Sequence, residues 1–143
     1  MVEKTIEAAI IEDLKAVIPE AKIIGLWQEV ITGEIRQEPP LINVAAKPMF
    51  PPEPALPFFD IPVVIDVIIR PEFDSKKSRF ADWSDKVNGY VNGLVMPGDA
   101  ITALDGDGYN VTGVTINQGD AGYDGNDDLF YCSVNFTVHI TKC

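Results

Sequence analysis

Apolar residues recur at helical spacing in two segments of the chain. The first runs from about residue 3 to 18, where apolar side chains return every three or four positions before Pro19. The second begins at Ser75 or Ser78, either of which can cap a helix, and ends before Pro97. Its apolar stripe consists of Phe80, Trp83, Val87, Tyr90 and Leu94. The pattern therefore predicts two amphipathic helices.

Three strands are predicted between these helices. Residues 23–31 and 41–46 are apolar runs separated by a polar turn region and by Pro39-Pro40, so we expect them to form a hairpin. Residues 63–69 form a nearly continuous β-branched run, which is typical of a central strand that is covered on both faces.

Three more strands are predicted after the second helix, at residues 100–104, 109–118 and 129–141. The last of them alternates strictly between apolar and polar residues, as a half-buried antiparallel strand does. The predicted order is α-β-β-β-α-β-β-β. It indicates a single α+β domain over residues 1–143, with a mixed, mainly antiparallel sheet and two helices packed on it.

Two irregular segments interrupt this pattern. Residues 48–62 are rich in proline, and we expect a loop or arm that is neither a helix nor a central strand. Residues 119–128 are rich in Asp and Gly and are expected to form a long loop.

The proline-rich arm carries the predicted protein-contact residues. A chain stiffened by proline loses little entropy on docking, so the arm can bind a partner's groove, or it can fold back over its own core. Basic residues near the second helix contrast in charge with the aspartates of residues 99–128, and attraction between these two surfaces would orient such a contact. The predicted contact residues are Met49, Phe50, Leu56, Phe58, Phe59, Lys76, Lys77 and Arg79.

Charge narrows the choice of partners. The chain has 11 Lys and Arg against 22 Asp and Glu, and its formal net charge of −11 repels phosphate backbones. We therefore expect no specific nucleic-acid binding. The N-terminus lacks the apolar core of a signal peptide, and no long apolar run follows, so neither export nor membrane binding is expected.

Candidate catalytic chemistry is sparse. The single histidine, His139, shares a strand face with Ser133, but six positions separate them, and Cys132 points to the opposite face. We therefore expect a surface histidine, no catalytic residues and no enzyme activity, although a nucleophile from elsewhere in the chain stays possible.

Candidate metal-binding motifs are incomplete. One histidine and two distant cysteines exclude the usual zinc spacings. The Asp- and Gly-rich stretches 105–108 and 124–128 resemble pieces of calcium loops, but no glutamate closes either loop. Asp-Gly turns between strands explain the same residues, so no metal or other cofactor is expected.

The outline of the chain resembles the tail terminator and tail-completion proteins of long-tailed bacteriophages and prophages. The resemblance rests on an N-terminal helix (IEAAIIEDLKAVIP), a hairpin, a strand leading directly into a helix (VVIDVIIRPEFDSKKSRFADWSDKVNGYVNGL) and a closing pair of strands that ends in LFYCSVNFTVHIT. It implies a ring, commonly of six subunits, that caps the tail tube and joins it to the head. The implied partners are further copies of the chain and other tail or head-connector proteins, in the virion or in the host cytoplasm during assembly. The family has no catalytic residues to transfer.

A binding module is the main alternative. It would recognise a small ligand or a carbohydrate through the Asp-rich loops, with Trp27 or Trp83 as a stacking surface. Calcium dependence would favour this alternative.

Overall fold

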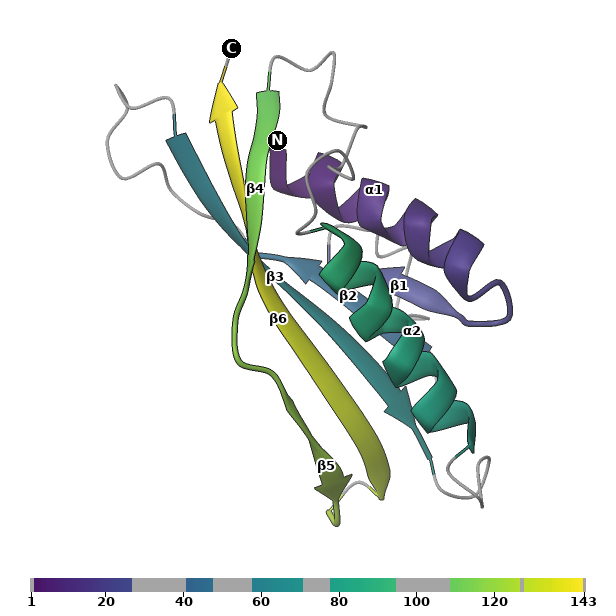
Figure 1. Cartoon of the computed structure of the whole chain (residues 1–143). Helices are drawn as coiled ribbons and strands as arrows, with labels where there is room; N and C mark the ends of the chain where they lie inside the picture. The colour runs from purple at the N-terminus through teal and green to yellow at the C-terminus, as the bar shows by residue number, and fades with distance from the viewer. Residues whose placement is uncertain are drawn as a thin grey trace.

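Two helices and six strands form the part of the chain that the computed structural model describes, which is residues 2–26, 41–47, 58–70, 78–94, 109–126 and 128–142 (Figure 1). The elements are α1 (Val2–Val17), β1 (Ile23–Gly25), β2 (Leu41–Ala46), β3 (Phe58–Ile69), α2 (Ser78–Leu94), β4 (Tyr109–Ile116), β5 (Asp120–Asp124) and β6 (Leu129–Lys142). The predicted α+β class, with a mixed and mainly antiparallel sheet, is confirmed.

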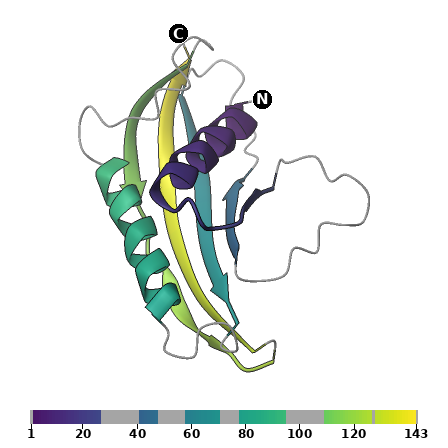
Figure 2. The ribbon, with the colours of Figure 1, turned by 90° about the vertical axis from the view of Figure 1, so that its right-hand side faces the viewer.

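The sheet is built around two long strands. β3 pairs with β6 in antiparallel register from Phe58 opposite Thr141 to Ile69 opposite Phe130 (Figure 2). β2 and then β1 follow on the free side of β3, whereas β4 and β5 share the free side of β6. β3 is therefore central, as predicted. Its second face is half-buried rather than covered, because every second residue from Pro62 to Ile68 stays partly exposed.

The core lies between the helices and one face of the sheet. α1 contributes the predicted stripe of Ile6, Ile10, Leu14 and Ile18, all fully buried. Alternate residues of β6 face it, and Phe136 is among the largest fully buried side chains. In α2 the buried residues are Trp83, Val87, Val91 and Leu94, while the predicted Phe80 and Tyr90 are only half-buried.

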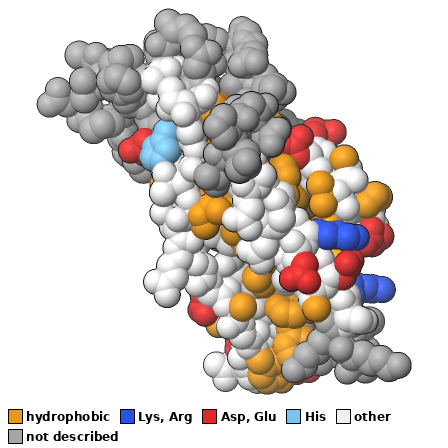
Figure 3. Space-filling view, viewed as in Figure 1, with side chains coloured by type: hydrophobic (Ala, Val, Ile, Leu, Met, Phe, Trp, Pro, Cys, Tyr) orange, Lys and Arg blue, Asp and Glu red, His pale blue; other side chains and the backbone are white. Residues whose placement is uncertain are grey.

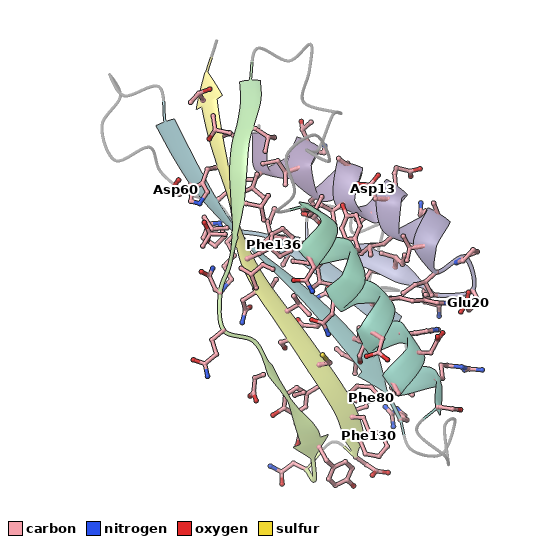
Figure 4. The ribbon with its side chains drawn as sticks, viewed as in Figure 1. Asp13, Glu20, Asp60, Phe80, Phe130 and Phe136 are labelled. Carbon is pink, nitrogen blue, oxygen red and sulfur yellow. The ribbon has the colours of Figure 1, made fainter. Side chains whose placement is uncertain are left out.

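Polar contacts tie α2 to the end of α1. The Tyr90 hydroxyl donates to Asp13 Oδ2 at 2.7 Å, and Trp83 Nε1 donates to Glu20 Oε1 at 3.2 Å (Figure 4). Burial, reinforced by the Asp13 carboxylate, raises the pKa of Tyr90, so its hydroxyl keeps the proton that it donates.

The predicted hairpin of residues 23–31 and 41–46 is wrong. β1 ends at Gly25 and runs parallel to β2, with Ile23 opposite Ile42. A parallel pair needs a long crossover rather than a tight turn. Residues 27–40 supply a connection of sufficient length, whereas the polar turn signal in the sequence suggested direct reversal.

Gly25 sets the distance between α1 and β1. A Cβ added at Gly25 would lie only 2.8 Å from Ile11 Cδ1 and would overlap the buried Glu7 carboxyl group. A side chain at this position would require the ends of the Glu7 and Ile11 side chains to move, so glycine lets α1 lie close to β1 without such a shift.

The predicted loop over residues 119–128 is also partly wrong, because Asp120–Asp124 forms β5. Gly119 allows the approach, since a Cβ there would overlap the Ser133 carbonyl oxygen. A turn at Gly125 and Asn126 follows, in which the Asn126 backbone N–H donates to Asp124 Oδ1 at 3.0 Å. The Asp and Gly residues thus form an exposed edge strand and its turn, a place where charge discourages unwanted pairing.

The predicted arm over residues 48–62 overlaps β3, because its last five residues, 58–62, belong to that strand. Pro62 is tolerated there for a geometric reason. The last residue pair between β2 and β3 is Ala46 and Val63, and just beyond it the Pro62 carbonyl accepts from the Lys47 N–H at 2.9 Å. The N–H that proline lacks would point to the same side, at the end of β2, where no further strand pair requires it. The rest of the arm and the predicted strand 100–104 lie outside the described residues.

Candidate functional site

The helix-free face of the sheet is the broadest functional candidate. Alternate residues of β2, β3, β6 and β4 point to it, and no described helix covers it. Its polar members include Asn43, Asp60, Asp66, Thr115, Ser133, Asn135, Thr137 and His139. The strict alternation of β6 predicted this polar row, but not the partners that each side chain meets.

Side chains on this helix-free face bind one another. Ser133 Oγ donates to Asp66 Oδ1 at 2.5 Å, which links β6 to β3. Asn117 Nδ2 donates to Thr137 Oγ1 at 2.9 Å, and Asn135 Nδ2 donates to the Gln118 carbonyl at 3.0 Å. The polar surface is thereby organised into fixed cross-strand pairs.

His139 lies at the centre of a second group on the same face. Its Nδ1 is 2.6 Å from Asp60 Oδ1 on β3, and its Nε2 is 2.7 Å from Thr115 Oγ1 on β4 (Figure 4). Ser133, which sequence spacing had placed too far away, binds Asp66 instead. The sequence could not identify Asp60 and Thr115, because only the registers of β3 and β4 against β6 bring them to His139.

A carboxylate, an imidazole and a hydroxyl in this order resemble a hydrolytic triad. Triads act in sites that exclude water and supply donors for an oxyanion. Here the side chains of His139 and Asp60 are 35% and 65% accessible. An exposed polar contact of this kind contributes at most about 1 kcal/mol. The arrangement is suited to tying β3, β6 and β4 together.

A hollow lies elsewhere, at the sheet edge where β4 ends and β5 begins. Its volume is about 280 Å³, and its walls include Asn88 of α2 together with Asn117, Asp120, Cys132 and Ser133.

The ligand-binding alternative required an exposed tryptophan. Trp83 is only 2% exposed and belongs to the core, and Trp27 lies outside the described residues.

The tip of the β5–β6 hairpin combines aromatic rings with carboxylates. The rings of Tyr123 and Phe80 both contact the ring of Phe130, with centroid distances of 5.5 and 5.7 Å. Hydrophobic side chains gather at the lower end of the molecule (Figure 3). The Tyr123 hydroxyl donates to Asp128, and this hydrogen bond is the main cause that raises the pKa of Tyr123.

The predicted protein-contact residues are only partly described. Met49, Phe50, Leu56, Lys76 and Lys77 lie outside the described residues. Phe58 and Phe59 occupy the first two positions of β3. Arg79 is exposed at the start of α2, with its guanidinium carbon 6.0 Å from the centre of the Trp83 ring.

Calcium is expected to leave the thermal stability unchanged. The described residues contain no group of three or more His, Cys, Asp or Glu that could hold a metal ion, and Asp120 and Asp128 already accept hydrogen bonds from tyrosines. A ligand stabilises a protein only when its concentration exceeds its dissociation constant. Melting curves with millimolar calcium should therefore match those with magnesium or with chelator. A rise of several degrees specific to calcium would instead favour the binding-module alternative.

Comparisons with known proteins give no family assignment, since neither a protein-family model nor a curated protein matches the chain. Within the described residues, no helix is both long and apolar enough to cross a membrane.

Proposed function

We propose that the protein is a structural assembly subunit of the tail terminator type, which forms a ring of identical subunits, caps a phage tail tube and joins it to the head. The observation that carries this proposal is the helix-free face of the sheet. Small-molecule sites are concave, whereas protein interfaces of standard size are broad and mix polar with apolar area. A broad face of polar side chains that are held in place by hydrogen bonds between strands is suited to contact with another protein chain.

The element order adds support. The described elements also follow the order α-β-β-β-α-β-β-β, although β5 lies at Asp120–Asp124 and the strand predicted at residues 100–104 lies outside the described residues. The N-terminal helix, the strand that leads into a helix and the closing strands match the outline of tail terminators, whereas the hairpin of that outline is replaced by the parallel pair of β1 and β2. The long β3–β6 pair and the polar ties between the helices give a subunit of this shape the rigidity that a ring requires.

Charge adds a second argument. A net charge of −11 repels the phosphates of DNA that must pass through such a ring without adhering to it. The exposed acids Asp120 and Asp128 contribute to this field.

The test is the mass of the native assembly. We expect native mass spectrometry of the purified protein at increasing concentration to detect a closed oligomer, commonly a hexamer, and negative-stain microscopy to show rings. A protein that remains monomeric at the highest accessible concentration would contradict the proposal. The rest of the proline-rich arm stays a predicted contact in such a ring.

A further inference from the structure

The two edges of the described sheet differ in charge. At the β1 edge, Lys22 precedes β1 and Lys47 follows β2, and both are exposed. Neither lysine makes an ion pair with a described residue. At the opposite edge, Asp120 begins β5, Asp124 ends it and Asp128 follows in the turn. Two carboxylates also lie near β1, but Glu7 is buried against Gly25 and Glu20 accepts from Trp83 Nε1. The exposed charged residues that directly flank β1 and β2 within the described residues are thus lysines, whereas those of the opposite edge are aspartates.

Exposed apolar side chains also occur at both edges of the described sheet. Among the described residues, the large hydrophobic side chains classed as exposed are Val17 (37%), Leu26 (53%), Ile116 (42%) and Tyr123 (54%). Leu26 comes directly after β1, and Val17 ends the helix that leads into it. Ile116 ends β4, and Tyr123 lies in β5. Each edge thus has apolar surface beside its charges.

The outer backbone of each edge pairs with no other described strand. Among the described strands, β1 pairs only with β2, and β5 pairs only with β6. An edge strand presents a row of N–H and C=O groups on its outer side, which another chain can pair with. These edges are short, so side chains must supply much of the specificity.

We propose that the β1 edge of one copy contacts the β4–β5 edge of the next copy. This inference rests on the proposed ring and names its subunit contact. Lys22 and Lys47 would face the carboxylates of β5, while Leu26 would pack against Tyr123. The contact is heterologous, because different surfaces meet, and repeated heterologous contacts generate rings when the rotation closes.

Charge selects this arrangement over a symmetric one. Pairing two β5 edges would place the carboxylates of Asp120 and Asp124 against their copies, and pairing two β1 edges would place lysines together. Like charges brought together across an interface are strongly unfavourable. Only a contact between unlike edges places lysines opposite carboxylates and avoids both of these repulsions.

Charge reversal tests the contact. The first variant, Asp120→Lys with Asp124→Lys, makes both edges basic, and the second, Lys22→Glu with Lys47→Glu, makes both edges acidic. We expect each variant alone to need at least ten times the protein concentration of the wild type to assemble. An equimolar mixture should assemble again, because every junction then joins opposite charges. Native mass spectrometry should detect equal numbers of the two variants in assemblies with an even number of subunits.

Matched controls separate edge contacts from net charge. Asp82→Lys with Asp85→Lys on α2 matches the charge change of the first variant, and Lys86→Glu on α2 changes the charge in the same direction as the second. These residues lie on an exposed part of α2 away from both edges, and we expect smaller effects from them. Circular dichroism and melting curves establish that each variant is folded. If a reversal variant does not fold, Leu26→Ser and Tyr123→Ser replace it, and each should raise the concentration needed for assembly. The melting temperature should stay close to that of the wild type for Leu26→Ser and fall for Tyr123→Ser, which also removes the contacts with Phe130 and Asp128.

The outcomes separate the two proposals. A monomeric wild type overturns the ring and the edge contact together. A wild-type ring that survives the reversal variants or both serine variants leaves the ring intact and overturns the edge contact. Reversal variants that stay monomeric when mixed also overturn the charge pairing.

Discussion

Phe136→Ala is expected to lower the free energy of unfolding by about 3–5 kcal/mol, as large-to-small substitutions of buried aromatic residues do. Phe136 lies near the middle of β6, fully buried, and pairs in register with Val63 on one side and Ile116 on the other (Figure 4). The hydrogen bonds of β6 to β3 and β4 fix the backbone on both sides of Phe136. The cavity left by the ring cannot collapse easily, so the cost should fall in the upper part of the range. Urea denaturation followed by circular dichroism measures it.

Thr141→Ala is the matched control for this substitution, because Thr141 lies on the same strand but on the helix-free face. A partly exposed side chain of this kind should cost about 0.5 kcal/mol or less. Equal losses for the two variants, or a loss under about 1 kcal/mol for Phe136→Ala, would mean that the faces of β6 are assigned wrongly.

Trp83→Ala should destabilise the protein by a similar amount, about 3–5 kcal/mol. The indole is 2% exposed between α2 and the sheet, and its Nε1 donates to Glu20 Oε1. The substitution therefore removes both a large apolar group and a link between α2 and the segment after α1. Loss of the link would leave the Glu20 carboxylate to solvent, which costs little, so packing accounts for most of the effect.

Trp83→Phe separates the two contributions. It keeps an aromatic ring in the core and deletes the N–H donor, and we expect a loss of about 1–2 kcal/mol. Thermal melts of the three proteins in the same buffer give the ranking. If Trp83→Phe were as damaging as Trp83→Ala, the hydrogen bond to Glu20 would outweigh packing.

Elements determined by local pattern were predicted well. α1 was predicted at residues 3–18 and is observed at Val2–Val17, where Glu3 in the first turn and Lys15 in the last suit the helix dipole. β6 was predicted at 129–141 and is observed at Leu129–Lys142. In both cases the spacing of apolar residues alone specifies the buried face.

Features that depend on pairing between distant segments could not be predicted. The parallel direction of β1 depends on how the chain crosses back to β2, which no residue in β1 encodes. β5 reads as a loop because its residues are Asp, Ala, Gly, Tyr and Asp, yet β6 offers an unpaired edge at that position. Tertiary context outweighs local propensity at such strands.

The group around His139 likewise combines a feature that the local pattern predicts with partners that it does not. The polar row on β6 was predictable from alternation, and so was the surface position of His139. Its partners Asp60 and Thr115 come from two other strands, and a bulge between Val111 and Gly113 in β4 adjusts the register that brings Thr115 into reach.

The central position of β6 has a consequence for the order in which the chain can fold during synthesis. β3 leaves the ribosome well before its partner, as the bond between Ser133 and Asp66, 67 positions apart, illustrates. Until β6 emerges, β3 has an unpaired apolar edge, and β4 and β5 have no strand to join. Non-local pairing of this kind slows folding and exposes aggregation-prone strands. The sheet therefore cannot close before β6 is made, so the strand that β3, β4 and β5 share as a partner becomes complete only after residue 142 has been synthesised.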